Sequence, residues 1–167
     1  MNLTTLALMV VSAFPVCPLL AAQTTKSEVV YYADAYADYY GVPRALVRAI
    51  ITQESGWNRL AISSKGAAGL MQLLPDTAAE YGVKDLFSVT DNLRGGVHYI
   101  ADLLNQFHGE MRLAVAAYFC GTKHLALKGL SYSNPDVVAY VQSVRLQYLR
   151  ELRTDGLRNN SRQTGGQ

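Results

Sequence analysis

With 167 residues, the chain has room for one domain and a short tail, and this length is enough to bury a hydrophobic core. Half of its residues are hydrophobic and 17% are charged, which excludes an intrinsically disordered protein. The formal net charge of +2 comes from the residues beyond Leu152, so the rest of the chain is neutral. A neutral body lacks the broad basic face of a nucleic-acid-binding protein, and we expect no nucleic-acid partner.

The N-terminal segment indicates a cellular location. From Leu3 to Ala22 it is uncharged and mostly apolar, which is typical of a secretory signal peptide. We therefore predict a signal peptide at 1–22, cleaved near Ala22, and a periplasmic or exported mature protein. The alternative is a retained membrane anchor, because the run is about long enough to span a bilayer. Pro15 and Pro18 argue against a straight helix there.

After this segment, apolar residues recur at helical spacing. A first helix is predicted from Ser27 and ends at Gly41, and a second opens at Pro43. The inward-facing stripe of the second helix consists of Leu46, Val47, Ile50, Ile51 and Glu54. One acidic side chain therefore points in the same direction as the apolar ones.

The remaining segments complete a bundle. Residues 56–74 show no sustained period and are rich in glycine and serine, so we predict a loop. The helices expected beyond it are one from Pro75 to Gly82, one capped by Asp91 or Asn92 and closed by Gly109, one from Met111 to Phe119, and one from Pro135 through Leu152. The predicted fold class is mainly α, a single helical domain with a substrate groove, followed by a disordered basic tail at 153–167.

Glu54 is the candidate catalytic residue. It falls in the last turn of its helix, just before Gly56, where the helix dipole disfavours another negative charge. Burial beside apolar neighbours acts in the same direction, so both effects should raise the pKa of this carboxyl toward the range of a general acid. The alternative interpretation is a solvated cap or an ion-pair partner, as for many glutamates at helix ends.

Several short sequences together form a family pattern. They are Glu54-Ser55-Gly56-Trp57-Asn58, then Ser63, then Gly66-Ala67-Ala68-Gly69-Leu70-Met71-Gln72, and later Ala117-Tyr118 and Tyr140-Val141. In this order they resemble the soluble lytic transglycosylase family, which has a goose-type lysozyme-like fold. The resemblance extends from about Tyr31 to Val144. It implies that residues 23–152 are a lytic transglycosylase catalytic domain.

The resemblance also implies a reaction. Such enzymes cleave the β-1,4 bond between N-acetylmuramic acid and N-acetylglucosamine in peptidoglycan and form 1,6-anhydromuramyl products. By position, Glu54 would protonate the glycosidic oxygen and then take the proton of the C6 hydroxyl. One carboxylate is then sufficient, whereas ordinary glycosidases use two. Catalysis without a cofactor or a metal is expected.

Five further residues are assigned to substrate binding by their positions in the family pattern. They are Ser63, Met71, Gln72, Tyr118 and Tyr140. Gln72 offers a donor and an acceptor to an acetamido group, and the two tyrosines offer rings and hydroxyls to a sugar. For Ser63 the alternative is a loop-capping hydroxyl, and for Met71 it is a core-filling side chain.

The pattern departs from the family after Tyr118. Phe119 and Cys120 stand where the family usually has asparagine and alanine, so a polar position becomes aromatic. Cys120 would be the only cysteine left after cleavage of the signal peptide, and we interpret it as a small buried side chain. His98, His108 and His124 show no metal-ligand spacing.

The expected partner is the peptidoglycan glycan strand, and the protein is expected to be a monomer. The small size of the chain is similar to that of specialised family members that open the wall for secretion, conjugation or pilus systems, so components of such a system are candidate partners. Two alternatives remain open. One is a lysozyme-type hydrolase, and the other is a weakly active wall-binding assembly factor, which the altered sequence after Tyr118 motivates.

Overall fold

The computed structural model describes residues 25–122, 125 and 134–164, with side chains described as far as 157. Over these residues the chain is helical and has no β-strand, and only two isolated β-bridges occur, Ile62 with Ala68 and Ala68 with Leu73. The predicted signal peptide lies outside the described residues. None of the helices in the described ranges combines the length and the apolar character needed to span a bilayer.

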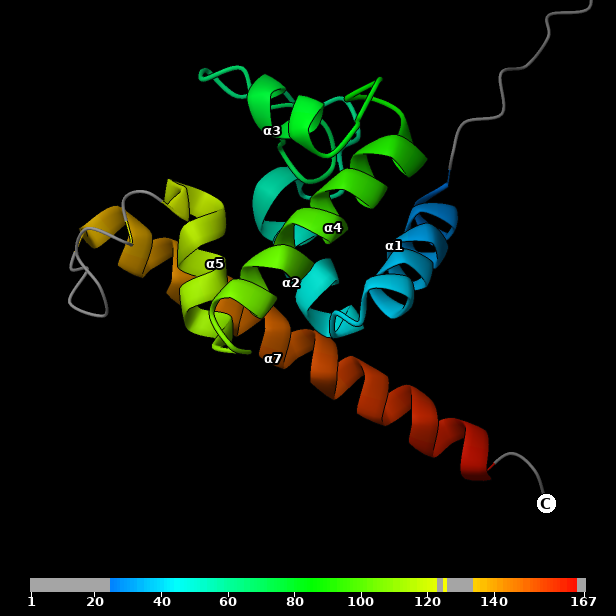
Figure 1. Cartoon of the computed structure of the whole chain (residues 1–167). Coiled ribbons are helices and arrows are strands. Elements are labelled where there is room, and N and C mark those ends of the chain that lie inside the picture. Colours follow the sequence, from blue (N-terminus) through cyan, green and yellow to red (C-terminus); the bar gives the residue numbers. More distant parts are fainter. Residues whose placement is uncertain (1–24, 123–124, 126–133, 165–167) are drawn as a thin grey trace, which may run out of the picture.

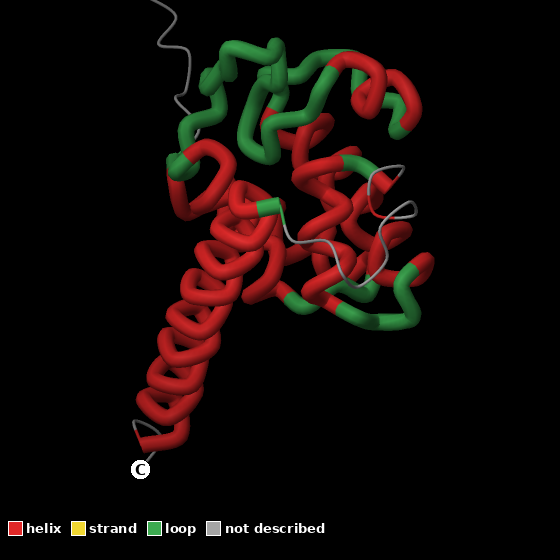
Figure 2. Tube along the Cα trace, turned by 90° about the vertical axis from the view of Figure 1, so that its left-hand side faces the viewer, coloured by secondary structure: helices red, strands yellow, loops and turns green. Residues whose placement is uncertain are grey.

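The helices of the described residues pack around a main hydrophobic core, and a smaller apolar cluster is formed by Ala116, Leu125 and Val137. Figure 1 shows how the helices are arranged. They are α1 (Lys26–Tyr40), α2 (Arg44–Ser55), α3 (Pro75–Glu80), α4 (Val89–Gln106), α5 (Met111–Cys120) and α7 (Pro135–Thr164). Helix α2 packs against α1 and α7, while α4 packs against α1 and α5. The long loop between α2 and α3 lies at one end of this bundle, as Figure 2 shows.

Helix α2 forms the centre of the core. It begins after Pro43, as the sequence predicts, and ends at Gly56, whose left-handed backbone (φ 56°) suits a glycine. The apolar residues of the predicted stripe, such as Leu46 and Ile50, are fully buried. Burying each of them contributes about 2 kcal/mol relative to exposure, so the carboxyl at the end of the same stripe is held in a fixed place.

The start of α4 differs from the prediction. Ser88, not Asp91 or Asn92, is the N-cap, and its Oγ accepts a hydrogen bond from the backbone N–H of Asp91 at 3.4 Å. The carboxylate of Asp91 instead accepts from the backbone N–H groups of Lys84 and Asp85. All three polar residues suit an N-cap, and contacts with the preceding loop decide among them.

Helix α7 continues well beyond the predicted boundary at Leu152. We expected a disordered tail from residue 153, but the helix runs to Thr164 and extends away from the other helices (Figures 1 and 2). The buried guanidinium of Arg48 accounts for the first part of this extension of α7. It pairs with Asp155 at 2.8 Å and Glu151 at 3.6 Å, and also with Asp34 of α1. These ion pairs fasten α7 to α1 and α2 past the expected end of the domain.

Candidate active site

Glu54 lies one residue before the end of α2. Its neighbour Ser55 fixes this end of the helix to the following loop, because its Oγ donates to the backbone carbonyl of Leu70 at 2.8 Å. Trp57 is half-buried, and its Nε1 donates to the hydroxyl of Thr52 at 2.9 Å. Trp57 therefore packs against the core at the end of α2.

The carboxyl of Glu54 accepts a hydrogen bond at Oε1 from the hydroxyl of Tyr140. Burial raises the pKa of Glu54 to about 7, and the Tyr140 hydrogen bond opposes part of this rise because it stabilises the carboxylate. No cation or second carboxylate of the described residues contributes to the shift. The predicted rise is therefore confirmed, and near neutral pH both protonation states are populated.

Two tyrosines from different helices reach this site. Tyr140 of α7 is buried, and Tyr118 of α5 donates its hydroxyl hydrogen to the backbone carbonyl of Met71 at 2.8 Å. Burial raises the pKa of both hydroxyls, and the nearby charge of Glu54 raises it further. Both therefore remain protonated hydrogen-bond donors around Glu54.

Asn92 holds the loop that follows α2, and the sequence did not reveal this role. Its side chain is buried; Oδ1 accepts from the backbone N–H of Met71 at 2.8 Å, and Nδ2 donates to the carbonyls of Ala68 at 3.1 Å and Leu86 at 2.9 Å. Gly69 has φ 82°, and a Cβ there would lie 2.2 Å from the Leu86 carbonyl oxygen. In the sequence, the only signal for this role was that Asn92 is a polar residue beside the apolar stripe of α4.

The predicted substrate-binding side chains in this loop are largely engaged with the protein itself. Met71 is fully buried and packs against Gly96, so the prediction that its side chain lines a groove is wrong and it fills the core. Gln72 uses Nε2 to donate to the carbonyls of Ala61 and Gly69, each at 3.0 Å. The side-chain oxygen of Gln72 is therefore the group that could bind a ligand, as a hydrogen-bond acceptor.

Ser63 takes the loop-capping role that we gave as its alternative. Its Oγ accepts a hydrogen bond from the backbone N–H of Ala67 at 3.0 Å. The hydroxyl still has its own hydrogen to donate, so a contact with substrate remains a prediction.

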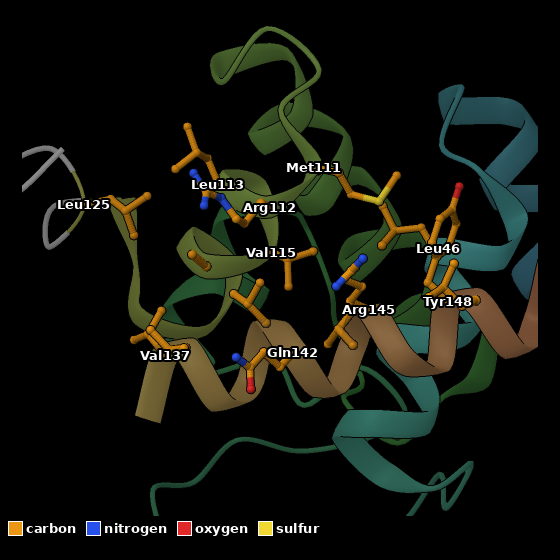
Figure 3. Close-up of a pocket in the computed structure, with 15 residues that line it drawn as sticks. Leu46, Met111, Arg112, Leu113, Val115, Leu125, Val137, Gln142, Arg145 and Tyr148 are labelled. Atoms are coloured by element: carbon orange, nitrogen blue, oxygen red, sulfur yellow. The ribbon is translucent and has the colours of Figure 1, made fainter. Parts of the chain in front are cut away.

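An apolar cavity lies away from Glu54. It has a volume of about 540 Å³ and is formed mainly by α5 and α7, as Figure 3 shows. Its lining is mostly apolar, with Arg112, Gln142 and Arg145 as the polar members, and it does not include Glu54. Since it offers no acid or nucleophile, we place the candidate active site at Glu54.

In the described part of the chain, no group of three or more acidic, histidine or cysteine residues is placed to hold a metal ion.

The comparison with known families is decisive. The family described as "Transglycosylase SLT domain" matches residues 31–136, which is more than half of the chain. The chain belongs to this family. The resemblance stated from the sequence is thereby confirmed.

Individual SLT-domain relatives are longer proteins. The chain is 34% identical over 142 residues to a membrane-bound lytic murein transglycosylase F from Alteromonas mediterranea, an alignment that covers 78% of this chain and 30% of the relative. It is 39% identical over 88 residues to a transglycosylase of Enterobacteria phage PRD1, covering 53% of this chain and 32% of the relative. The chain thus spans about a third of the length of these relatives.

Solved structures confirm the mainly α, lysozyme-like SLT fold. An inactive mutant of the lytic transglycosylase Slt from Pseudomonas aeruginosa, with one glutamate replaced by glutamine, matches with a TM-score of 0.68 and 26% identity. This match covers 75% of this chain and 24% of the other. The 70 kDa soluble lytic transglycosylase from Escherichia coli matches with a TM-score of 0.66 and 25% identity, covering 74% and 24%.

Proposed function

We propose that this SLT domain is a peptidoglycan lytic transglycosylase, which cleaves the β-1,4 bond between N-acetylmuramic acid and N-acetylglucosamine. The observation that carries this proposal is the state of Glu54. Burial raises the pKa of its carboxyl to about 7, and its hydrogen-bond partner is the hydroxyl of Tyr140. A carboxyl with this pKa is suited to give a proton and then to take one back at neutral pH.

The reaction follows from these two roles. Protonated Glu54 donates its proton to the glycosidic oxygen as the bond from that oxygen to C1 of the muramic sugar breaks. The C6 hydroxyl of the same sugar forms a new bond to C1, and the Glu54 carboxylate accepts the proton that this hydroxyl loses. The products are a 1,6-anhydro end and a free 4-hydroxyl, and no water is consumed.

Within the described part of the chain, no other carboxylate contributes to the pKa of Glu54, and this favours the reaction over hydrolysis. Glycosidases that use water or a covalent intermediate place two carboxyl groups on opposite sides of the bond, about 5–10 Å apart. Within the described residues, the pKa of Glu54 responds to burial and Tyr140, with no contribution from another carboxylate. An internal hydroxyl as the nucleophile removes the need for one.

The comparisons support the same substrate. The Alteromonas mediterranea relative is named a lytic murein transglycosylase and the phage PRD1 relative a transglycosylase. The Pseudomonas aeruginosa lytic transglycosylase is an inactive mutant in which one glutamate is replaced by glutamine. That replacement indicates that one glutamate is essential in that protein. We assign the corresponding role here to Glu54.

The cellular role is a further part of the proposal. We propose export through the N-terminal segment at 1–22, and action as a monomer on the wall beside a secretion, conjugation or pilus apparatus. The support for export is the apolar composition of that segment.

Product analysis tests the reaction. Purified peptidoglycan would be digested with the protein, and the muropeptides would be identified by mass spectrometry. We expect 1,6-anhydro products, each one water lighter than the corresponding reducing-end product. Reducing-end products alone would identify a hydrolase, and tight binding to peptidoglycan without any released product would identify a wall-binding factor.

A further inference from the structure

Phe119 occupies an unusual place beside the candidate active site. It is the second-to-last residue of α5, it follows Tyr118, and 44% of its surface is exposed. Its ring stacks on the ring of Tyr140, with the centroids 4.5 Å apart and the planes inclined by 22°. Phe119 is thus separated from the Glu54 carboxyl by one side chain, the tyrosine that donates to Oε1.

We propose that Phe119 is a positioning residue: stacked on Tyr140, it shields the hydrogen-bonded pair of Tyr140 and Glu54 from water. The inference rests on the proposed role of Glu54 as the acid. It assigns a function to an aromatic residue at a position where the family resemblance leads us to expect an asparagine.

The burial of the neighbours supports this role. Tyr140 is only 7% exposed although it adjoins the surface residue Phe119, so the exposed ring of Phe119 takes the solvent contact that Tyr140 would otherwise have. Stacked aromatic pairs of this kind are favourable beyond the burial of area alone. Phe119 therefore also restrains the tyrosine ring, and with it the hydroxyl on Glu54.

The electrostatics of the site make shielding important. Burial is the largest cause of the raised pKa of Glu54. The titratable groups that couple to this site are Tyr140 from α7, Tyr118 from α5 and, through these two, Tyr99 from α4. All of them are neutral donors near pH 7, and none supplies a charge that could replace burial. Admission of water is then the direct way to lower the pKa of the acid.

Three substitutions separate the contributions of Phe119. Phe119→Tyr keeps the stacked ring, Phe119→Leu keeps the apolar cover without the ring, and Phe119→Asn restores a polar side chain. The position is partly exposed, so each variant has room, and circular dichroism with thermal unfolding establishes that each one folds. The readout is the pH at which the Glu54 carboxyl is half-protonated, followed by carbon-13 NMR of the full chain labelled on glutamate and assigned with Glu54→Gln.

We expect Phe119→Tyr to match the wild type and Phe119→Asn to lower the Glu54 midpoint by about 1 pH unit, with Phe119→Leu between them. The alkaline limb of the pH profile for cleavage should move down equally, mainly through kcat. An unchanged or raised midpoint in folded Phe119→Asn would overturn the inference. The NMR titration needs no substrate, so a chain that releases no anhydro products would refute the proposed function and leave this test intact.

Discussion

Helix α2 carries two buried ionisable side chains in opposite surroundings. Arg48, in its first half, is 7% exposed and meets the carboxylates of Asp34, Glu151 and Asp155. Asp34 and Asp155 raise its pKa, so it remains charged. Glu54, near the end of the same helix, has no cation beside it in the described structure, and burial raises its pKa to about 7. One site stabilises a charge, and the other disfavours one.

The difference separates a structural role from a catalytic one. The Arg48 cluster joins α1, α2 and α7 and uses its charges to hold helices together. The Glu54 site contributes less to holding the fold, because an unpaired carboxyl in a buried place costs free energy as soon as it ionises. Such a cost is expected where a group must change protonation state during a reaction.

Replacing Glu54 should have the largest effect on activity. We expect Glu54→Gln to lower the rate of peptidoglycan cleavage by on the order of 10³-fold or more, because the amide has no proton to donate. Release of soluble muropeptides measures the rate. Glu80→Gln, at an exposed position, is the matched control and should keep wild-type activity. Equal rates for Glu54→Gln and the wild type would contradict a catalytic role for Glu54.

Replacing Arg48 should have the largest effect on stability. Arg48→Met leaves half-buried Asp34 without its cation, and we expect a loss of about 3 kcal/mol in the free energy of unfolding. Urea denaturation followed by circular dichroism measures the loss. Arg44→Met removes the exposed pair with Asp38 and should change stability little. If Arg48→Met were as stable as Arg44→Met, the Arg48 cluster would not hold the helices together.

The stability of the wild type should depend on pH through Glu54. Its pKa is raised from 4.5 to about 7 in the folded state, so the unfolded chain loses this proton first as the pH rises. The free energy of unfolding should therefore fall as the pH rises from 4.5 to about 7, by at most about 3 kcal/mol in total. The difference in unfolding free energy between wild type and Glu54→Gln isolates this effect from the lowered pKa values of Asp38 and Asp91. A difference that does not vary with pH would contradict it.

Removing the Tyr140 hydroxyl should have the smallest of these effects. Because its hydrogen bond lowers the pKa of Glu54, Tyr140→Phe should raise that pKa further and move the alkaline limb of the cleavage profile upward. The cost in stability should be about 1 kcal/mol. The pH profile of cleavage, measured beside thermal unfolding, tests both. A downward shift would mean that the hydroxyl acts mainly by excluding water.

Local patterns in the sequence predicted the parts of the fold that depend on neighbouring residues. The helix ends at Gly41 and Gly56 and the buried stripe of α2 were predicted correctly, since backbone conformation and periodicity are local properties. The same stripe predicted a raised pKa for Glu54, because an acid that follows Ile50 by one helical turn is buried with it.

Contacts between distant segments could not be read in this way. Met71 fills the core because Gly96 of α4 leaves space for it, and Asn92 holds a loop that precedes it by more than twenty residues. Helix α7 passes Leu152 partly because Asp155 meets Arg48. Each depends on tertiary packing, for which short motifs and periodicity carry no signal.

The most direct test is the protonation of Glu54 in the unaltered protein. Carbon-13 NMR of the labelled carboxyl, recorded from pH 4 to pH 9, gives its midpoint without any assumption about substrate. We predict a midpoint near 7, at which Glu54 serves both as acid and as base. A midpoint near 4.5, the ordinary value of a glutamate, would contradict it, because the carboxyl would then be ionised at neutral pH and have no proton to give.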